Sequence, residues 1–476
     1  MIYIHNTLSG TKEEFKPITK GAVSMYNCGP TVYNTVHIGN LRTFVMDDII
    51  RRVFEYEGYA VTQVMNSTDV DDKTIRNSIA EKKTLLEFTR HYEALFLADI
   101  HTLNILTPHH FLRATEHIKE MIDMIIALLE KGIAYPTKDG IYFSIGMFPE
   151  YGKLAGIKLT DEVRERIAND EYEKENPRDF ALWKFYSQGD GEVFWEASFG
   201  KGRPGWHIEC SAMSISALGS TFDIHTGGID NIFPHHVNEI AQSEAATGKH
   251  FVNYWIHGAF MNVNDEKMAK SKGNFLKLAD LEEAGISPLA FRYWLLTSHY
   301  RSQVNFSLEA VRGAQNAFIR LIEAFIDYST VEHIHDDHHH HHAQVAEHAG
   351  GMVNYRAQFK KAVTDDFNMP EAVALVWKLI KDPTIEHSEK SALMLDFDKV
   401  LGLGLAGVLE MTKNETEIPT DIPVEVTTLL EAREEARKGK EWDKADALRK
   451  EIESRGYKVK DTETGAKLVS DRGVAR

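Results

Sequence analysis

Cysteine is scarce in this chain: among 476 residues only Cys28 and Cys210 carry a thiol. A large chain so poor in cysteine is typical of a reducing compartment, where structural disulfides are rare. Three roles stay open for the two thiols, namely a disulfide between them, buried apolar packing, and metal binding. The count alone favours functional or packed thiols over a structural disulfide.

Two further absences narrow the class of protein. The chain lacks the roughly 18 consecutive apolar residues of a membrane span and the basic and apolar regions of a signal peptide. We therefore predict a cytoplasmic protein with no membrane attachment. The net charge of −17 argues against a dedicated nucleic-acid binder. Residues 432–476, however, hold 13 Lys and Arg against 10 Asp and Glu, which makes RNA a candidate partner of the tail.

The N-terminal region alternates strands and helices, which predicts an α/β fold with a parallel sheet. The strand-like run 22–26 is followed by a turn-rich connection and by an amphipathic helix from Leu41 to about Glu57. A strand, a Gly-rich loop and a helix N-terminus together form a phosphate site, although an ordinary βα turn has the same pattern. A second strand, 60–65, precedes a polar run at 66–73. Parallel strands bind ligands at their carboxyl ends, so we expect both polar segments at one rim.

Other helices can be predicted from the sequence, without a chemical role for their residues. We expect helices at 85–103 and 115–131, with Thr115 as the N-cap of the second. Of Asp69, Asp71 and Asp72, at least one is expected to cap the helix that follows. From 352 onward the pattern is helical, and the tail predicts two short basic helices and a small hairpin.

Four side chains suggest a metal centre. His235 and Glu239 are four residues apart on a predicted helix that opens at Phe233-Pro234, so they project from one face. With Cys28 and Cys210 they form a Cys₂-His-Glu set that suits tetrahedral Zn²⁺. Neither CxxC nor HExxH is present, so spacing alone favours buried packing of the two cysteines over a metal site.

Several motifs together resemble those of bacterial cysteinyl-tRNA synthetases, which are class I aminoacyl-tRNA synthetases. Cys28–Tyr33 and His37–Asn40 resemble the opening signature, and Lys267–Ser271 resembles the second class I motif. Further similar runs continue almost to the end of the chain, at 68–73, 179–184, 202–213, 233–245, 366–370 and 397–402.

The resemblance implies a Rossmann-type parallel-sheet catalytic domain, a connective insertion, a helical-bundle anticodon-binding domain and a small C-terminal domain. The corresponding boundaries are 1–113 and 203–262 for the two halves of the catalytic domain, 114–202 for the insertion, 263–330 for the second-motif loop and stem-contact region, 331–351 for a His-rich connection, 352–412 for the anticodon-binding domain, 413–423 for a linker and 424–476 for the basic C-terminal domain.

The implied reaction joins L-cysteine to ATP as cysteinyl-adenylate, with release of pyrophosphate, and then transfers cysteine to the 3′ end of tRNA-Cys. The catalytic residues would be His37, Asn40, Lys267 and Lys270; ATP, with Mg²⁺, would also contact Gly39 and Met268. The resemblance further implies one Zn²⁺ per chain, held by Cys28, Cys210, His235 and Glu239, to recognise the substrate thiolate. His236 is an alternative to His235, but only His235 keeps the i, i+4 relation to Glu239.

Candidate contacts for the cysteine substrate are Gly29, Thr31, Thr68, Asp69, Trp206 and Asp230. For Trp206, core packing is an equally good interpretation. The tail resembles the anticodon-contacting segment of the family at Arg433, Arg437, Trp442 and Asp446. Basic side chains with an interleaved aromatic suit binding of an unstacked RNA loop. A charged helix face is the alternative interpretation. The protein is expected to be a monomer.

The chain departs from the family pattern at Asn40, Ala269 and Leu468, where His, Ser and Trp are usual. Two competing functions remain. A cysteine ligase of the mycothiol-pathway type would share the catalytic domain but lack the anticodon-binding tail. A nucleotide- or RNA-binding regulator that has lost catalysis would agree with the departures at Asn40 and Ala269.

Overall fold

The computed structural model describes residues 1–157, 179–264, 266–267, 275–330, 342–416, 423–455, 457–462 and 465–470; for 266–267 it describes the backbone only. The chain forms two compact units. The first contains the described residues up to Leu321 and those from 342 to Leu403; the second contains those from Ile322 to Thr330 and from Gly404 onward.

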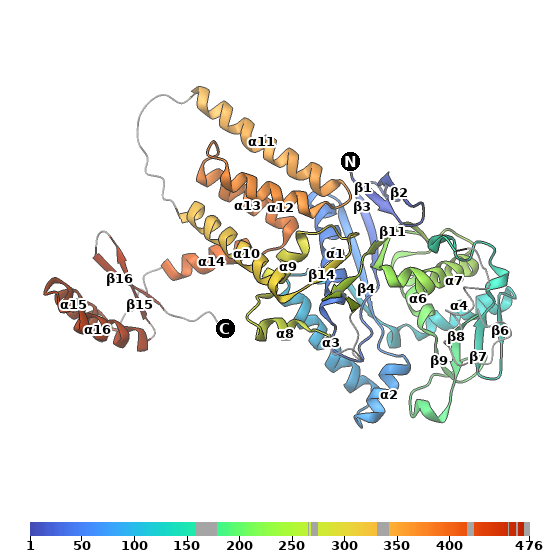
Figure 1. Ribbon diagram of the computed structural model, residues 1–476. Helices are drawn as coiled ribbons and strands as arrows, with labels where there is room; N and C mark the ends of the chain where they lie inside the picture. Colours follow the sequence, from blue (N-terminus) through green and yellow to red (C-terminus); the bar gives the residue numbers. More distant parts are fainter. Residues whose placement is uncertain are drawn as a thin grey trace. The chain divides into compact units, whose positions relative to one another are not determined.

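A five-stranded parallel sheet forms the centre of the first unit (Figure 1). Its order is β11 (Val252–Gly258), β10 (Phe222–Gly228), β3 (Ala22–Asn27), β4 (Ala60–Ser67) and β5 (His110–Arg113). Both predicted N-terminal strands are confirmed and run one and two residues further than expected. The chain reverses its winding between β3 and β10, which is where open α/β sheets bind ligands.

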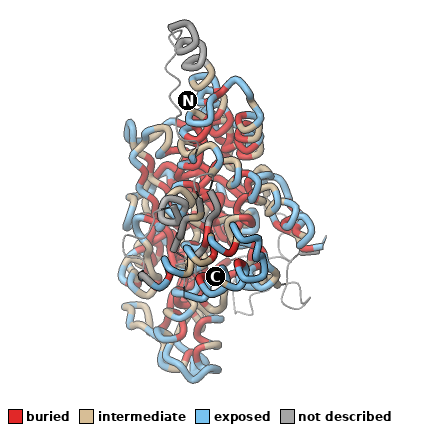
Figure 2. The backbone as a smooth tube through the Cα atoms, turned by 90° about the vertical axis from the view of Figure 1, so that its left-hand side faces the viewer, coloured by how far each residue is buried: buried red, intermediate tan, exposed pale blue. Residues whose placement is uncertain are grey.

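Helices cover both faces of this sheet, so its strands are largely buried (Figure 2). Figure 1 shows α1 (Ile38–Tyr56) on one side and α6 (Trp206–Leu218) with α7 (Val237–Thr247) on the other. Tyr26 and Val64 of the sheet share a hydrophobic core with Ile208 and Met213 of α6. This two-sided burial explains the continuous apolar runs of the strands. A short antiparallel hairpin, β1 (Tyr3–Asn6) with β2 (Thr11–Glu14), precedes the sheet.

The predicted helix at 41–57 begins earlier than expected, at Ile38. Its N-cap is His37, whose Nδ1 accepts a hydrogen bond from the Asn40 backbone N–H at 3.1 Å, while the Asn40 Oδ1 accepts one from the His37 N–H at 3.4 Å. This reciprocal capping box stabilises the first turn. The motif at 37–40 is therefore the start of the helix itself.

The acidic run after β4 also caps a helix. Asp71 is the N-cap of α2 (Asp72–Ala80), as expected for one of the three acidic residues, and α3 (Leu85–Thr102) follows. The prediction that Thr115 caps the next helix is wrong, since α4 (Ile118–Glu130) begins after His117. Thr115 lies instead in a 3₁₀ turn, where its N–H and hydroxyl donate to the Asp69 carboxylate at 2.9 and 2.6 Å.

The insertion builds its own sheet rather than extending the parallel one. Four antiparallel strands lie in the order β6 (Ala134–Pro136), β7 (Gly140–Phe143), β8 (Phe180–Phe185) and β9 (Gly202–Pro204). The predicted boundary at 202 falls inside β9, and α6 starts two residues after this strand, at Trp206.

The remainder of the first unit links the sheet to a group of helices. A small sheet orders β13 (Glu266–Lys267), β12 (Met261–Val263) and β14 (Val304–Phe306). The helices are α8 (Leu278–Glu283), α9 (Pro288–Leu296), α10 (Leu308–Thr330), α11 (His342–Thr364), α12 (Met369–Lys381) and α13 (His387–Leu401). The helical character predicted from 352 is confirmed, but α11 begins ten residues earlier, at His342, inside the segment that was expected to be a connection. Of these helices, α8, α9, α11, α12 and α13 belong to the first unit, α10 divides between the two units after Leu321, and α13 packs against α1.

The second unit contains α14 (Leu405–Thr416), α15 (Val424–Lys438) and α16 (Trp442–Ser454), together with the antiparallel pair β15 (Tyr457–Thr462) and β16 (Gly465–Ser470). Val426, Ile452 and Val459 form its core. The two short helices and the hairpin predicted for the tail are confirmed. Among all described helices, none has both the length and the apolar character that crossing a membrane requires.

Candidate functional site

Four predicted metal ligands come together at the carboxyl edge of the central sheet. Cys28 directly follows β3, Cys210 lies in α6, and Glu239 lies in α7, with His235 in the turn before it. We call these four residues the ligand cluster. Their ligand atoms lie within 4.8 Å of one another. Residues separated by up to 211 positions thus converge because β3 ends next to β10 and both α6 and α7 pack on this face.

The distances inside the ligand cluster suit a shared metal ion. The two sulfurs are 4.0 Å apart and the thiols are free, so the disulfide alternative is not realised. His235 Nε2 lies 3.0 Å from Glu239 Oε1, as the i, i+4 spacing predicted. Two thiols, an imidazole and a carboxylate are a donor set that zinc prefers, and all but the partly buried Cys28 belong to buried residues. The residues present therefore fit a structural or substrate-binding zinc.

Burial and the neighbouring groups shift the pKa values of the two thiols in opposite directions. Burial raises the pKa of Cys28 well above its ordinary value. The hydrogen bond from Cys28 lowers the pKa of Cys210, and the neighbouring His235 lowers it further. Cys210 thus ionises readily, whereas Cys28 keeps its proton. A metal ion bound by both sulfurs would displace the proton of Cys28.

Histidines surround the ligand cluster and orient it. His207 Nδ1 lies 2.8 Å from His235 Nδ1, so the Nε2 atom of His235 faces Glu239. On the other side, His225 Nε2 lies 3.0 Å from Glu239 Oε2. Such contacts fix the ring orientation of a metal-binding histidine.

A second donor set overlaps the first. It consists of Cys28, His225, His236 and Glu239, and His236 Nε2 is 3.3 Å from the Cys28 sulfur. The adjacent His236 is therefore also near the centre. Only the set with His235 includes both cysteines, and His235 is nearer to Glu239 than His236 is, at 3.0 against 3.8 Å.

The ligand cluster opens into a cavity of about 350 Å³. Of the predicted substrate contacts, five line it: Gly29, Thr31, Thr68, Trp206 and Asp230. Asp69 is not among the lining residues; it is 1% exposed and bound to Thr115. Its carboxylate thus organises the chain after β5 in this structure.

Two lining residues show how closely the cavity is built. Gly29 donates its N–H to Asn66 Oδ1 at 2.9 Å, and a Cβ at this position would overlap the Asn66 carbonyl, so only glycine fits. Trp206, the first residue of α6, stacks on His235 with ring centroids 4.3 Å apart, yet remains 43% exposed. Trp206 thus forms a wall of the cavity rather than part of the core.

The start of α1 lies on the same cavity. We call residues His37–Asn40 the helix-start motif. His37 and Asn40 line the cavity together with Phe275, whose ring meets that of His37 edge-on at 5.2 Å. The first-turn N–H groups and the dipole of a 19-residue helix favour a bound anion here.

The second class I motif is only partly visible. Lys267 lies on β13, where the backbone alone is described, and Met268, Ala269 and Lys270 lie outside the described residues. The His-rich run at 333–341 also lies outside them.

The structure brings several unpredicted residues into the site. Tyr33, Asn34, Asn66 and Lys73 line the cavity, and His207, His225 and His257 stand behind it. Lys73 belongs to a run that resembles the family, which is a signal that the sequence offered. The histidines are spread over three elements, and no local spacing could have grouped them.

The predicted tRNA-contact residues lie in the second unit. Trp442 is 58% exposed, Asp446 is exposed and Arg437 is half-buried. Arg433 is instead 3% exposed, and its Nη1 donates to Glu434 at 2.7 Å. Because a direct contact with RNA needs an accessible guanidinium, this structure does not support Arg433 as a contact.

Comparison with known proteins agrees with this geometry. The family model described as the class I (C) tRNA synthetase catalytic domain matches residues 14–316, and the model of the cysteinyl-tRNA ligase anticodon-binding domain matches residues 420–467. Among solved structures, a leucyl-tRNA synthetase of Agrobacterium radiobacter K84 in a ternary complex covers 84% of the chain and 85% of its own, with a TM-score of 0.61 and 10% identity. A methionyl-tRNA synthetase of Mycobacterium tuberculosis, in complex with methionyl-adenylate, has a TM-score of 0.56 at 15% identity and covers 83% and 90%. The fold, the family models and the helix-start motif define a class I aminoacyl-tRNA synthetase.

Similarity over the whole chain then narrows the class. The cysteine–tRNA ligase of Protochlamydia amoebophila is 43% identical, covering 98% of this chain and 97% of its own. That of Brachyspira hyodysenteriae is 42% identical and covers 98% of both chains. The chain belongs to the cysteine–tRNA ligase family, and it is therefore an enzyme of the ligase class.

Proposed function

We propose that the protein activates L-cysteine with ATP, releasing pyrophosphate, and transfers cysteine from the adenylate to the 3′ end of tRNA-Cys, with a zinc ion selecting the thiol. One observation carries the proposal: the ligand cluster and the helix-start motif line or adjoin one cavity of about 350 Å³. Amino acid and nucleotide would then react where the two sites meet, and positioning is the main requirement of such a phosphoryl displacement.

Cys28, Cys210, His235 and Glu239 would hold one Zn²⁺ per chain. Bound there, zinc would favour the thiolate of cysteine over the hydroxyl of serine, a discrimination that an apolar pocket achieves only weakly. Thr31, Thr68, Trp206 and Asp230 would surround the rest of the substrate. We also propose that the protein is cytoplasmic and monomeric.

Three hydrogen bonds fix the position of Thr68 beside the cavity. Its hydroxyl donates to Glu209 Oε2 at 2.8 Å, and its backbone pairs with the Pro30–Val32 segment through Thr68 N to Pro30 O at 3.0 Å and Val32 N to Thr68 O at 3.2 Å. These bonds tie the end of β4 to the loop that carries Cys28 and Gly29. A substrate bound between them would meet a fixed surface.

The helix-start motif would bind the ATP phosphates. The Asn40 side-chain oxygen is used in the capping box, so its amide nitrogen is the end that can donate to a phosphate oxygen. Lys267 and Lys270, with Met268 nearby, would act from the second motif, where lysine charge stabilises the leaving pyrophosphate. Mg²⁺ would accompany ATP.

The tail would contact tRNA through Arg437, Trp442 and Asp446. Trp442 supports this role because an exposed tryptophan at the start of a helix, 58% accessible, is a stacking surface for an unpaired base. The anticodon-binding family model covers this same region, 420–467.

Two assays on the intact chain test the proposal. Cysteine-dependent ATP–pyrophosphate exchange measures activation, and charging of tRNA with labelled cysteine measures transfer. The proposal predicts both activities. Exchange without charging would favour a cysteine ligase that uses another acceptor, and absence of both would favour a binding protein without catalysis.

A further inference from the structure

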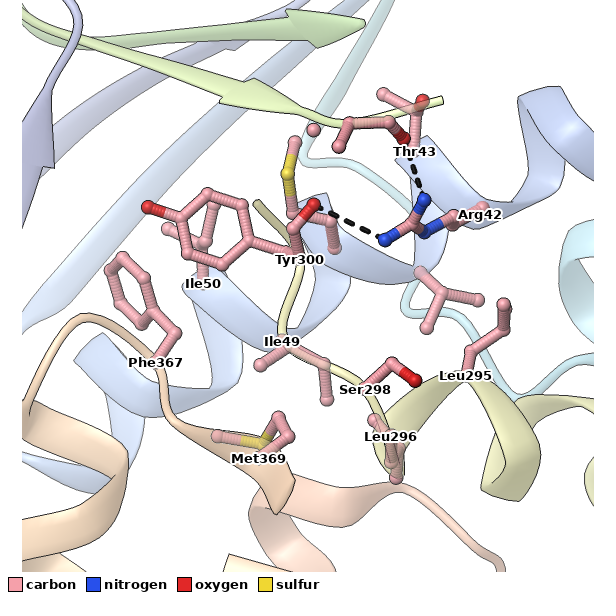
Figure 3. A pocket seen from close by; sticks show the side chains of 14 residues that line it. Arg42, Thr43, Ile49, Ile50, Leu295, Leu296, Ser298, Tyr300, Phe367 and Met369 are labelled. Atoms are coloured by element: carbon pink, nitrogen blue, oxygen red, sulfur yellow. Dashed lines mark hydrogen bonds between the residues drawn. The ribbon is translucent and has the colours of Figure 1, made fainter. Parts of the chain in front are cut away.

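Arg42, one residue beyond the first turn of α1, makes an unusual set of contacts. Its side chain is 8% exposed, and it carries a charge that belongs to no ion pair among the described residues. Its guanidinium donates to five backbone carbonyls: Ala259 O and Phe260 O at 2.7 Å each, His299 O and Tyr300 O at 3.3 Å each, and Ser302 O at 2.5 Å. Figure 3 shows Arg42 directed toward Tyr300, beside an apolar pocket.

The five carbonyls come from two segments that both enter the small sheet. Ala259 and Phe260 connect β11 to β12, and 299–302 precedes β14. The two segments are also hydrogen-bonded to each other. The Ala259 N–H donates to Tyr300 O at 2.9 Å, and the Val304 N–H donates to Phe260 O at 3.3 Å. Arg42 therefore joins the start of this sheet to α1. Removing its guanidinium would take the donor from Ala259 O and Ser302 O, whereas the other three carbonyls also accept backbone N–H groups.

The small sheet leads to the second class I motif, because β12 pairs with β13, which carries Lys267. The residues that follow the motif contact α1 again. Ile38 donates its N–H to Leu276 O at 2.9 Å, and Phe275 packs on His37. The first turn of α1 is thus attached to chain on both sides of the motif. Arg42 supplies the attachment on the N-terminal side.

A second set of bonds holds the 299–302 segment from the opposite side. Tyr300 donates its hydroxyl to Asp366 Oδ1 at 2.6 Å, and Arg301 Nε donates to Asp366 Oδ2 at 2.8 Å. Asp366 lies in the corner between α11 and α12, and its N–H donates to Tyr3 O at 2.9 Å. This segment is therefore held between Arg42 and Asp366, and it can transmit a shift of either one.

We propose that Arg42 is a positioning residue for cysteine activation: it sets the place of β12 and β13 relative to the helix-start motif without touching a substrate. The inference rests on the proposed ATP site at His37–Asn40. A displacement of about 1 Å between reacting groups can lower a rate by about 100-fold, so we expect loosening of this joint to lower the rate of exchange.

Arg52 offers a matched control on the same helix. It is 9% exposed and also donates to carbonyls, Lys399 O at 3.1 Å and Asn104 O at 2.7 Å, but near the C-terminal end of α1; unlike Arg42 it also pairs with Asp48 Oδ2, at 2.7 Å. Arg42→Lys and Arg52→Lys each keep the charge and lose the planar fork that binds several acceptors. Both variants are to be measured in the zinc-loaded full chain for ATP–pyrophosphate exchange, bound zinc and urea unfolding.

We expect Arg42→Lys to raise KM for ATP or lower kcat by about 10-fold or more, and Arg42→Ala by about 100-fold, with KM for cysteine and the zinc content unchanged. Millimolar guanidinium should restore part of the Arg42→Ala activity, which a loss of folding would not allow. Arg52→Lys should lower the unfolding midpoint and leave both KM values within about twofold.

Wild-type exchange kinetics in Arg42→Lys and Arg42→Ala would overturn the inference. The inference would also be overturned if the kinetic parameters for ATP and for cysteine worsened equally, in proportion to the fall of the urea unfolding midpoint, and if guanidinium restored no activity. The variant Asn40→Ala distinguishes this result from a wrong assignment of the ATP site. If the exchange kinetics of Asn40→Ala toward ATP are unchanged, the site assignment is wrong. If Asn40→Ala is impaired while both Arg42 variants are normal, only the role of Arg42 is refuted.

Discussion

In the ligand cluster, Cys210 and Glu239 are 2% and 0% exposed, whereas in the helix-start motif His37 is half-buried and Asn40 exposed. The ligand cluster is built from three chain segments that pack together, and surrounding histidines fix its donors. The helix-start motif is one local turn with a capping box. The difference matches the two tasks that we propose for them: a rigid buried site would select a small amino acid, and a more exposed one would let ATP enter and pyrophosphate leave.

The largest effect is expected from Cys210→Ser. Loss of this thiolate should abolish zinc binding and reduce cysteine-dependent exchange on the order of 1,000-fold, more than the 10–100-fold that follows loss of a partner to a metal ligand. Bound zinc is measured by emission spectrometry on dialysed protein. Ser214→Ala, one turn further along α6 with its hydroxyl on the Ser211 carbonyl, is the control and should keep its zinc. Full zinc content in Cys210→Ser would instead indicate the set with His225 and His236.

The next effect concerns the helix-start motif. Asn40→Ala should lower kcat of exchange by about 100-fold, the effect of removing one well-placed donor from a developing charge. KM for cysteine and zinc content should not change. Asn40→Asp keeps an oxygen for the capping box but places negative charge beside the phosphates, so it should be at least as impaired. Normal activity in Asn40→Asp would show that only the cap of α1 matters.

A smaller effect is expected from Trp442 in the second unit. Trp442→Ala should raise KM for tRNA by about 10-fold in the charging assay, within the 1–3 kcal/mol that stacking of one base contributes. Exchange without tRNA should be unchanged. Leu86 on α3 is equally exposed, at 58%, and Leu86→Ala provides the control. Equal charging by the two variants would remove Trp442 from the tRNA-contact site.

The last prediction concerns stability rather than activity, and it involves the buried carboxyl of Asp47 in α1. Asp47 accepts the Thr226 hydroxyl at 2.6 Å, and burial raises its pKa to about 7. Between pH 4, near the unfolded-state pKa, and pH 7, the folded chain binds the extra proton, so stability falls as the pH rises through this window. Asp47→Asn should remove that slope and be more stable than the parent at pH 8 by roughly 2 kcal/mol, with no gain at pH 4. Urea unfolding at both pH values is the measurement, and identical pH slopes would contradict the assignment.

The two parts of the cavity also differ in how far sequence could predict them. The helix-start motif is local: strand, turn and amphipathic helix are consecutive, so the element and its place at the sheet edge followed from periodicity. The i, i+4 spacing of His235 and Glu239 was likewise local and correct. That Cys28 and Cys210 join them depends on the order β10-β3-β4 and on helix packing. For these two residues resemblance to a family supplied what spacing could not.

Other features depend on contacts that no local pattern contains. Arg42 binds carbonyls more than 200 positions away, and nothing around it in the sequence indicates them. Thr115 looked like an N-cap by residue type, but Asp69 holds it in a separate turn. Arg433 looked like an RNA contact by charge, yet it is buried in the second unit. For Arg42 and Thr115 the deciding partners are distant in the sequence, and for Arg433 burial, which charge does not reveal, decides.

The central claim is that zinc in the ligand cluster binds the substrate through sulfur. X-ray absorption at the zinc edge tests it directly on the full chain, alone and with cysteine or serine. We predict two sulfur ligands in the free enzyme, from Cys28 and Cys210, and a third when cysteine is added, with no change on adding serine. A sulfur count that stays at two in the presence of saturating cysteine would contradict the account.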